Sequence, residues 1–399
     1  MILTQEEILM LEGKDGPAVQ KSLQILSALG KIYGAERMVP VTSVQVAGVS
    51  YDNLGEAGLE FLSSMADGGG RVRVLTTLNP AGMDVENWQA MGIPADFARS
   101  QERVIEAFAR MGVLTTCTCT PYLSGNKPGV GEHIAWAESS AVCFANSILG
   151  ARTNREGGPS ALAAALTGRT PAYGLHLVEN RVPGVTVEVR AKLEGTYSYG
   201  ALGYVIGKWI EREENKSVPF ITGLDDPGLE NLKSLCASIA TYGGAALFHI
   251  DGVTPEADQY SPPSEVWVAA QEDIDRAVEE LSTPGPTDAD FFSLGCPHLS
   301  IDEVARIAEL IRNKKVKGTF WITTSRPVKS LADQLGYTQI IEAAGATFAT
   351  DTCCVVAPIK GRFRCLVTDS AKACYYAASK NRFDTRFLPF DSVVLEAVK

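Results

Sequence analysis

The hydrophobic pattern of the chain alternates between two periods. In some segments apolar residues recur every three or four positions, as on one face of a helix, and we expect helices at residues 4–29, 59–65, 98–110 and 131–149. In others a short apolar run is bounded by glycine, proline or polar residues, and we expect strands at residues 38–47, 71–78 and 112–114. Strands that alternate with helices predict βαβ units and a mainly parallel sheet.

The same alternation continues toward the C-terminus. It runs through residues 185–189, 201–210, 220–224, 229–242, 245–250, 291–294, 301–311, 319–323 and 346–349. Pro262 and Pro263 then precede a long helix expected at residues 265–281, with a linker-like stretch after it. We therefore expect an α/β protein with N-terminal and middle lobes in residues 1–285 and a C-terminal α/β lobe in residues 286–399.

Length and composition narrow the class of protein. A chain of 399 residues exceeds one ordinary core, and 45% hydrophobic with 21% charged residues is typical of a globular protein. No apolar run is long enough to span a bilayer, and the first residues lack the features of a signal peptide. The net charge of −11 disfavours nucleic-acid binding but permits a local basic pocket. Nine scattered cysteines favour a reducing compartment, the cytoplasm, over a disulfide framework.

Three cysteines each follow a short apolar run. Cys119, Cys296 and Cys353 come after the runs at residues 112–114, 291–294 and 346–349, and each is followed by polar or proline-containing sequence. Strand ends of an α/β sheet gather at one edge, so these thiols are expected to converge. Three thiolates can hold an iron–sulfur cluster with one open iron. Free cysteine is also a common small core residue, and spacing alone leaves both interpretations open.

Several polar residues stand at other expected strand ends. Gly48-Val49-Ser50 offers backbone N–H groups to an anion or forms an ordinary turn, and Asn79-Pro80 is either a turn or an amide aimed into a site. Glu138 and Ser139 lie among small apolar residues, which slightly favours a buried functional acid.

Three cationic residues are further candidates. Arg152 and Arg155 form either an anion clamp or part of a solvated loop, and Lys372 ends a strand as another candidate anion contact. The four histidines show no metal-ligand spacing and are expected to be core or surface residues.

Taken together, these segments resemble the large subunit of the aconitase X family, in order and over nearly the whole chain. They are residues 48–50, 79–80, 119–122, 131–139, 152–160, 295–298 and 351–353. The resemblance implies an aconitase-like multi-lobe α/β architecture. It also implies an iron–sulfur cluster, 4Fe–4S or else 2Fe–2S, held by Cys119, Cys296 and Cys353. Cys117 and Cys354 stand next to two of these positions and leave the ligand choice open there.

The resemblance further implies a hydro-lyase. The chain is most similar to the archaeal branch, which dehydrates (R)-5-phosphomevalonate to trans-anhydromevalonate 5-phosphate in isoprenoid synthesis. The alternatives are dehydration of cis-3-hydroxy-L-proline and a non-catalytic cluster-sensing or scaffold subunit. Glu138 and Ser139 are the implied catalytic residues, and the implied substrate contacts are Gly48, Val49, Ser50, Asn79, Pro80, Glu138, Ser139 and Lys372.

A partner is also implied by the resemblance. The family uses a small swivelling domain, which is fused in some members and a separate subunit in others. We find no obvious copy of it in this sequence, so a small subunit is expected to complete the enzyme and to supply a serine as general base. The expected complex binds an anionic small molecule, and neither nucleic acid nor membrane.

Overall fold

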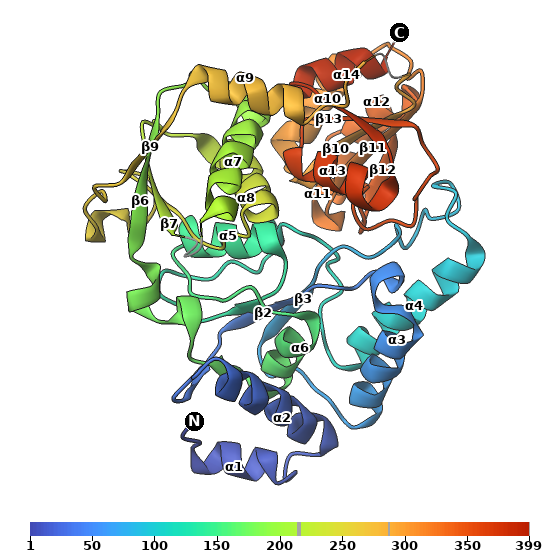
Figure 1. Ribbon diagram of the computed structural model, residues 1–399. Coiled ribbons are helices and arrows are strands. Elements are labelled where there is room, and N and C mark those ends of the chain that lie inside the picture. Colours follow the sequence, from blue (N-terminus) through green and yellow to red (C-terminus); the bar gives the residue numbers. More distant parts are fainter. Residues whose placement is uncertain (214–216, 286–287, 399) are drawn as a thin grey trace.

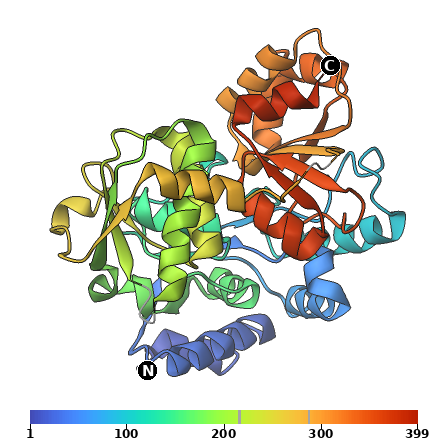
Figure 2. The same cartoon turned by 45° about the horizontal axis from the view of Figure 1, so that its top comes forward.

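The computed structural model describes residues 1–213, 217–285 and 288–398 of the chain. Three lobes, each built on a parallel sheet, occupy separate corners of the molecule in both views (Figures 1 and 2). The expected α/β class with mainly parallel sheets is confirmed. The expected boundary of the C-terminal lobe falls on residues 286–287, which lie outside the described residues.

The first lobe contains a three-stranded parallel sheet in the order β3-β2-β4, formed by Leu75–Leu78, Ser43–Val46 and Ala135–Trp136. Its helices are α1 (Gln5–Leu11), α2 (Pro17–Ile32), α3 (Tyr51–Asp67), α4 (Ala95–Arg110) and α6 (Gly158–Thr167). A small antiparallel pair joins β1 (Met38–Pro40) to β5 (Arg169–Pro171). A capping box starts α1, since Thr4 and Glu7 bond each other's backbone N–H groups.

The middle lobe has a four-stranded parallel sheet in the order β8-β7-β6-β9. Its strands are His249–Ile250, Val218–Thr222, Pro183–Val189 and Val266–Ala269. Helices α7 (Gly195–Arg212) and α8 (Gly228–Tyr242) pack together, and α5 (Ser139–Ser147) packs on α8 beneath them (Figure 1). Helix α9 (Gln271–Glu280) leads to the last lobe.

The C-terminal lobe has a five-stranded parallel sheet in the order β12-β11-β10-β13-β14. Its strands are Thr347–Thr350, Thr319–Thr324, Phe291–Leu299, Cys365–Thr368 and Asp384–Phe387. The surrounding helices are α10 (Ile301–Ile311), α11 (Arg326–Gln334), α12 (Tyr337–Ala343), α13 (Ala371–Tyr376) and α14 (Phe390–Ala397). In the described residues, no helix combines the length and the apolar composition that crossing a bilayer requires.

Several expected element bounds are wrong, and tertiary pairing explains them. The long helix expected at residues 265–281 is strand β9 followed by α9, because Val266 to Ala269 pair with β6. The helix expected at residues 131–149 begins only at Ser139, since Ala135 and Trp136 pair with β2. Residues 38–47 form two strands, β1 and β2, that belong to different sheets.

Two of the strands predicted to precede the cysteines also differ from the structure. Residues 112–114 form no strand, and Leu114 makes a single bridge with Thr77. Cys296 lies within β10 rather than after it, because β10 continues past a register shift to Leu299 beside β11. Cys353 does follow its strand, β12, as expected.

The first and C-terminal lobes are joined by polar contacts near their strand ends. The Arg326 guanidinium at the start of α11 binds the carboxylates of Asp351, Asp84 and Glu86. The backbone N–H of Ala81 donates to the carbonyl of Asp351 at 2.7 Å. These contacts fix the edge of one sheet against the edge of the other, and the candidate site lies there.

Candidate active site

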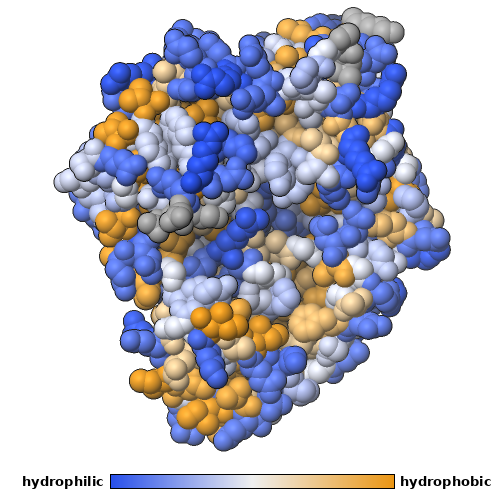
Figure 3. Space-filling model, viewed as in Figure 1, coloured by the Kyte–Doolittle hydropathy of each residue, from blue (hydrophilic) through white to orange (hydrophobic). Residues whose placement is uncertain are grey.

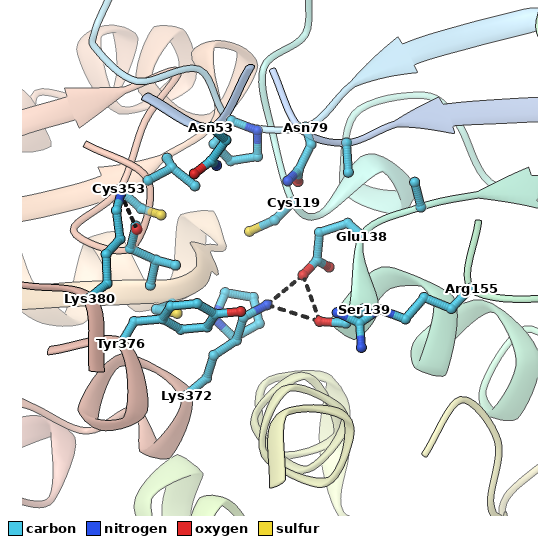
Figure 4. Close-up of a pocket in the computed structure, with 18 residues that line it drawn as sticks. Asn53, Asn79, Cys119, Glu138, Ser139, Arg155, Cys353, Lys372, Tyr376 and Lys380 are labelled. Carbon is cyan, nitrogen blue, oxygen red and sulfur yellow. Dashed lines mark hydrogen bonds and ion pairs between the residues drawn. The ribbon is translucent and has the colours of Figure 1, made fainter. Parts of the chain in front are cut away.

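A pocket of about 300 Å³ lies where the lobes meet, which is within the usual size of small-molecule sites. The surface is hollowed at the centre of the face seen in Figure 3, and Figure 4 shows the lining side chains. Gly48, Asn79 and Glu138 line it just after the carboxyl ends of β2, β3 and β4. This is the sheet edge at which α/β proteins bind ligands.

The three expected cysteines reach this same pocket. Cys119 comes from the loop after α4, Cys353 from the loop after β12, and Cys296 from within β10. The neighbours Cys117 and Cys354 do not line it; both are buried in separate apolar clusters. The structure therefore brings together Cys119, Cys296 and Cys353, while their role as ligands stays a prediction.

Each of these thiols receives a hydrogen bond that stabilises an anionic sulfur. The His298 N–H donates to Cys119 Sγ at 3.2 Å, the Ser370 hydroxyl bonds Cys296, and backbone N–H groups bond Cys353. Burial nevertheless raises the pKa of all three thiols, for Cys296 to about 12. Mutual repulsion of the thiolates raises the pKa of Cys119 and Cys296 further. A cationic centre held by Cys119, Cys296 and Cys353 would offset that penalty, because it favours the thiolate form of its ligands.

The three thiols can be compared with the ligand sets of a single metal ion and of an iron–sulfur cluster. Among the described residues, no three histidine, cysteine or acidic side chains are grouped closely enough to hold one metal ion. An iron–sulfur cluster would instead be held by thiolates on separate irons, and Cys119, Cys296 and Cys353 would supply three of them. Three buried thiols with donors to each sulfur fit such a cluster.

A buried ion pair forms part of the pocket lining. Lys372, at the start of α13, bonds Glu138 at 2.5 Å (Figure 4). It also bonds Ser140 Oγ at 2.8 Å. Glu138 also caps α5 by accepting the Ala141 N–H at 2.6 Å. Burial would raise the pKa of this carboxyl, but Lys372 and the capping bond hold it below its usual value. Burial likewise disfavours the charged lysine, yet Glu138 leaves the pKa of Lys372 above its ordinary value.

The other expected substrate contacts divide into two groups. Gly48, Asn79, Pro80 and Ser139 line the pocket, and the side-chain oxygen of Asn79 is buried without a hydrogen-bond partner in the described structure. Val49 and Ser50 do not line it. Val49 is part of the core of the first lobe, and the Ser50 hydroxyl donates to the Val356 carbonyl at 3.0 Å.

Four further polar residues line the pocket: Asn53, Arg155, Tyr376 and Lys380. Sequence reasoning named only Arg155 among them. A signal for two others was present, because positions 372, 376 and 380 recur every four residues and share one helical face. Lys380 bonds Asp52 at 3.1 Å.

The two arginines considered as an anion clamp behave differently. The Arg155 side chain extends toward Ser139, and among the described residues it has neither an ion-pair nor a hydrogen-bond partner (Figure 4). Arg152 does not line the pocket, and its Nε is buried without a partner in the described structure. A single arginine is thus available to an anion here.

Comparison with known proteins gives a consistent result along the whole chain. Family models for the first, second and third domains of aconitase X match residues 1–179, 183–282 and 289–399. The phosphomevalonate dehydratase large subunit of Methanothermobacter thermautotrophicus is 50% identical over 94% of this chain and 93% of its own length. The cis-3-hydroxy-L-proline dehydratase of Hypocrea jecorina is 35% identical over 94% of this chain and 65% of its own length.

A solved structure agrees with these matches. The crystal structure of Thermococcus kodakaraensis aconitase X in its holo-form superposes with a TM-score of 0.92 at 46% identity, over the full length of both chains. The fold, the order of the domains and the sequence similarity all agree with aconitase X proteins, and the chain belongs to the aconitase X family.

Proposed function

We propose that this chain is the large subunit of a dehydratase that removes water from (R)-5-phosphomevalonate to give trans-anhydromevalonate 5-phosphate. The observation that carries the proposal is one pocket that joins Cys119, Cys296 and Cys353 to the buried pair of Lys372 and Glu138. Four archaeal relatives with 44–50% identity over nearly their whole length bear the name phosphomevalonate dehydratase large subunit.

The charge of the pocket favours this substrate over hydroxyproline. Arg155, Lys372 and Lys380 line it against the single carboxylate of Glu138. Lys380 is also paired with Asp52 outside the lining, so Arg155 remains as excess positive charge. A phosphate monoester carries about −1.5 to −2 at neutral pH, and the carboxylate adds one more negative charge. Hydroxyproline is a zwitterion without net charge and does not need this cation.

In the proposed enzyme Cys119, Cys296 and Cys353 hold an iron–sulfur cluster, 4Fe–4S in preference to 2Fe–2S. When bound, such a cluster supplies a Lewis acid that makes the tertiary hydroxyl a better leaving group. The unpartnered oxygen of Asn79 accepts a substrate hydroxyl, and the Ser139 hydroxyl orients the substrate carboxylate. The backbone at Gly48 and the side chain of Arg155 face the anionic end.

The proposed reaction also needs a base, and the pocket offers a poor one. Glu138 is held by Lys372 with a lowered pKa, so it takes up a proton weakly at neutral pH. We therefore assign proton abstraction to a serine on a small subunit that covers the pocket. The complex is proposed to act in the cytoplasm. The purified chain is expected to be nearly inactive alone and active when the small subunit is added. A full dehydration rate from the single chain would remove the partner from the mechanism.

The first experiment measures iron and acid-labile sulfide in the two-subunit complex, prepared anaerobically. Near-stoichiometric cluster should be lost in Cys119→Ser, Cys296→Ser and Cys353→Ser. The matched controls are Cys117→Ser and Cys354→Ser, because these buried thiols lie within two residues of Cys119 and Cys353 but outside the pocket. If the wild-type complex contains no iron, or if the control variants lose as much iron, the three cysteines are structural core residues and not cluster ligands.

A substrate panel on the same complex then separates the candidate reactions. Turnover of phosphomevalonate without turnover of cis-3-hydroxy-L-proline is the expected result. The opposite preference would make the chain a hydroxyproline dehydratase subunit. A complex that holds its cluster but dehydrates neither compound would support a cluster-sensing or scaffold role.

A further inference from the structure

We propose that His298 is a positioning residue that ties together the three segments carrying Cys119, Cys296 and Cys353. This inference rests on the proposed cluster. His298 is fully buried and lies two residues after Cys296 on β10. Its backbone and both ring nitrogens contact the other two cysteine segments, and none of these contacts was expected from the sequence.

The first set of contacts reaches the Cys119 segment, which belongs to the other lobe. The His298 N–H donates to Cys119 Sγ at 3.2 Å, and its Nδ1 lies 3.0 Å from Thr118 Oγ1. Thr118 Oγ1 in turn accepts the Thr120 N–H at 3.2 Å. Cys119 is therefore held by its own sulfur and by both flanking threonines.

The other ring nitrogen reaches the Cys353 segment. His298 Nε2 lies 3.0 Å from the carbonyl oxygen of Thr352. A carbonyl can only accept, so Nε2 carries the hydrogen, and in the neutral ring Nδ1 then accepts from the Thr118 hydroxyl. One imidazole thus uses its donor for one cysteine segment and its acceptor for the other.

This arrangement bears on the cluster in two ways. Groups that orient the ligands of a metal centre affect how tightly it is held, by about 10- to 100-fold in measured cases. Hydrogen bonds to cluster sulfurs also help to set the reduction potential. The ring links segments that are distant in sequence, so its loss removes the bonds to Thr118 and Thr352 and leaves only the backbone bond from His298 to Cys119 Sγ. His298 touches no reacting atom in this scheme and acts through the cysteines.

The test uses His298→Asn and His298→Gln in the anaerobic complex with the small subunit. Asparagine places an acceptor near the position of Nδ1 and gives up the bond to Thr352, whereas glutamine places a donor near Nε2 and gives up the bond from Thr118. Both variants are expected to lose iron to a chelator about 10-fold faster than wild type or more. Their electron paramagnetic resonance spectra, after reduction, should also differ from the wild-type spectrum.

The matched control is His249→Gln. His249 is equally buried, and its Nε2 bonds the Arg181 carbonyl at 2.8 Å in the middle lobe. This variant should keep the wild-type rate of iron loss. Equal rates in wild type and both His298 variants, or the same acceleration in the control, would overturn the role of His298. Wild-type complex that holds no cluster would instead overturn the proposed function itself.

Discussion

Lys372 and Glu138 illustrate, at the scale of single residues, why buried charges occur in pairs. Each charge alone is costly to bury, but together they satisfy one another and Ser140 supplies a further oxygen. Glu138 also serves as the cap of α5, so the pair connects the first turn of α5 to the first turn of α13. The position of this part of the pocket lining therefore depends on both residues.

Replacement of Lys372 by alanine should raise KM strongly and lower the free energy of unfolding by about 3 kcal/mol, because Glu138 is left buried without its counterion. The double variant Lys372→Met with Glu138→Gln should regain stability but not activity. Steady-state kinetics and urea unfolding of the complex test both statements. An unchanged KM in Lys372→Ala would remove Lys372 from the substrate pocket.

Arg155 is the second residue whose charge can be tested. Arg155→Gln should raise KM for phosphomevalonate roughly 10-fold or more, because a charged hydrogen bond to the substrate is lost. Arg152→Gln is the control, since this arginine belongs to the same loop but does not line the pocket. Equal effects of the two substitutions on KM would show that the loop, and not the Arg155 charge, matters.

At the scale of elements, the ends of parallel strands determine where the site forms. Polar lining residues follow β2, β3, β4, β12 and β13, while the strands themselves carry the buried cores. Strand β12 and the loop after it are held to the first lobe through Asp84, whose carboxylate accepts the Thr350 N–H at 3.0 Å. Arg326 on α11 then binds both Asp84 and Asp351, two residues before Cys353.

Arg326→Ala should therefore weaken the joint between the first and C-terminal lobes. Asp84 and Asp351 are buried side by side, and without the guanidinium their repulsion is uncompensated. We expect the free energy of unfolding to fall by about 2 kcal/mol and iron to be retained less well. Arg306→Ala serves as control, because its ion pairs with Glu309 and Asp391 are exposed and within one lobe. Equal unfolding midpoints for the two variants would contradict the role of the clamp.

At the scale of the whole molecule, stability should depend on pH through His176. This side chain is buried beside His133, at 2.9 Å between their Nδ1 atoms, and burial lowers its pKa to about 3. In the unfolded chain its pKa is about 6.5, so between these values the unfolded state binds the extra proton. Stability is therefore lost as pH falls from about 6.5 toward 3.

Protonation of His176 in the unfolded chain should make the free energy of unfolding about 2 kcal/mol lower at pH 5 than at pH 8. His176→Gln should reduce the difference in unfolding free energy between these two pH values by about that amount, because glutamine does not titrate. Urea unfolding of wild type and variant at both pH values gives the comparison. Identical pH dependence of the two proteins would exclude His176 as the origin.

Much of the architecture could be predicted because it depends on neighbours in the sequence. The period of apolar residues predicted the alternation of strands and helices. The short strand β4 was missed, since its two residues pair with β2 from far along the chain. Strand β10 was expected to end too early for the same reason, as its last residues are held by β11.

The sequence by itself determined the α/β class, the three lobes' alternating pattern, and the cysteines whose resemblance to a family suggested a cluster. Only the tertiary structure decided that Cys119 and Cys353, and not the thiols beside them, line the pocket. It also decided that Lys372 meets Glu138 across 234 residues. Periodicity and turn chemistry act between neighbours and can be read locally. The direction of a side chain and its partner depend on which distant segments pack together, and folding alone sets that.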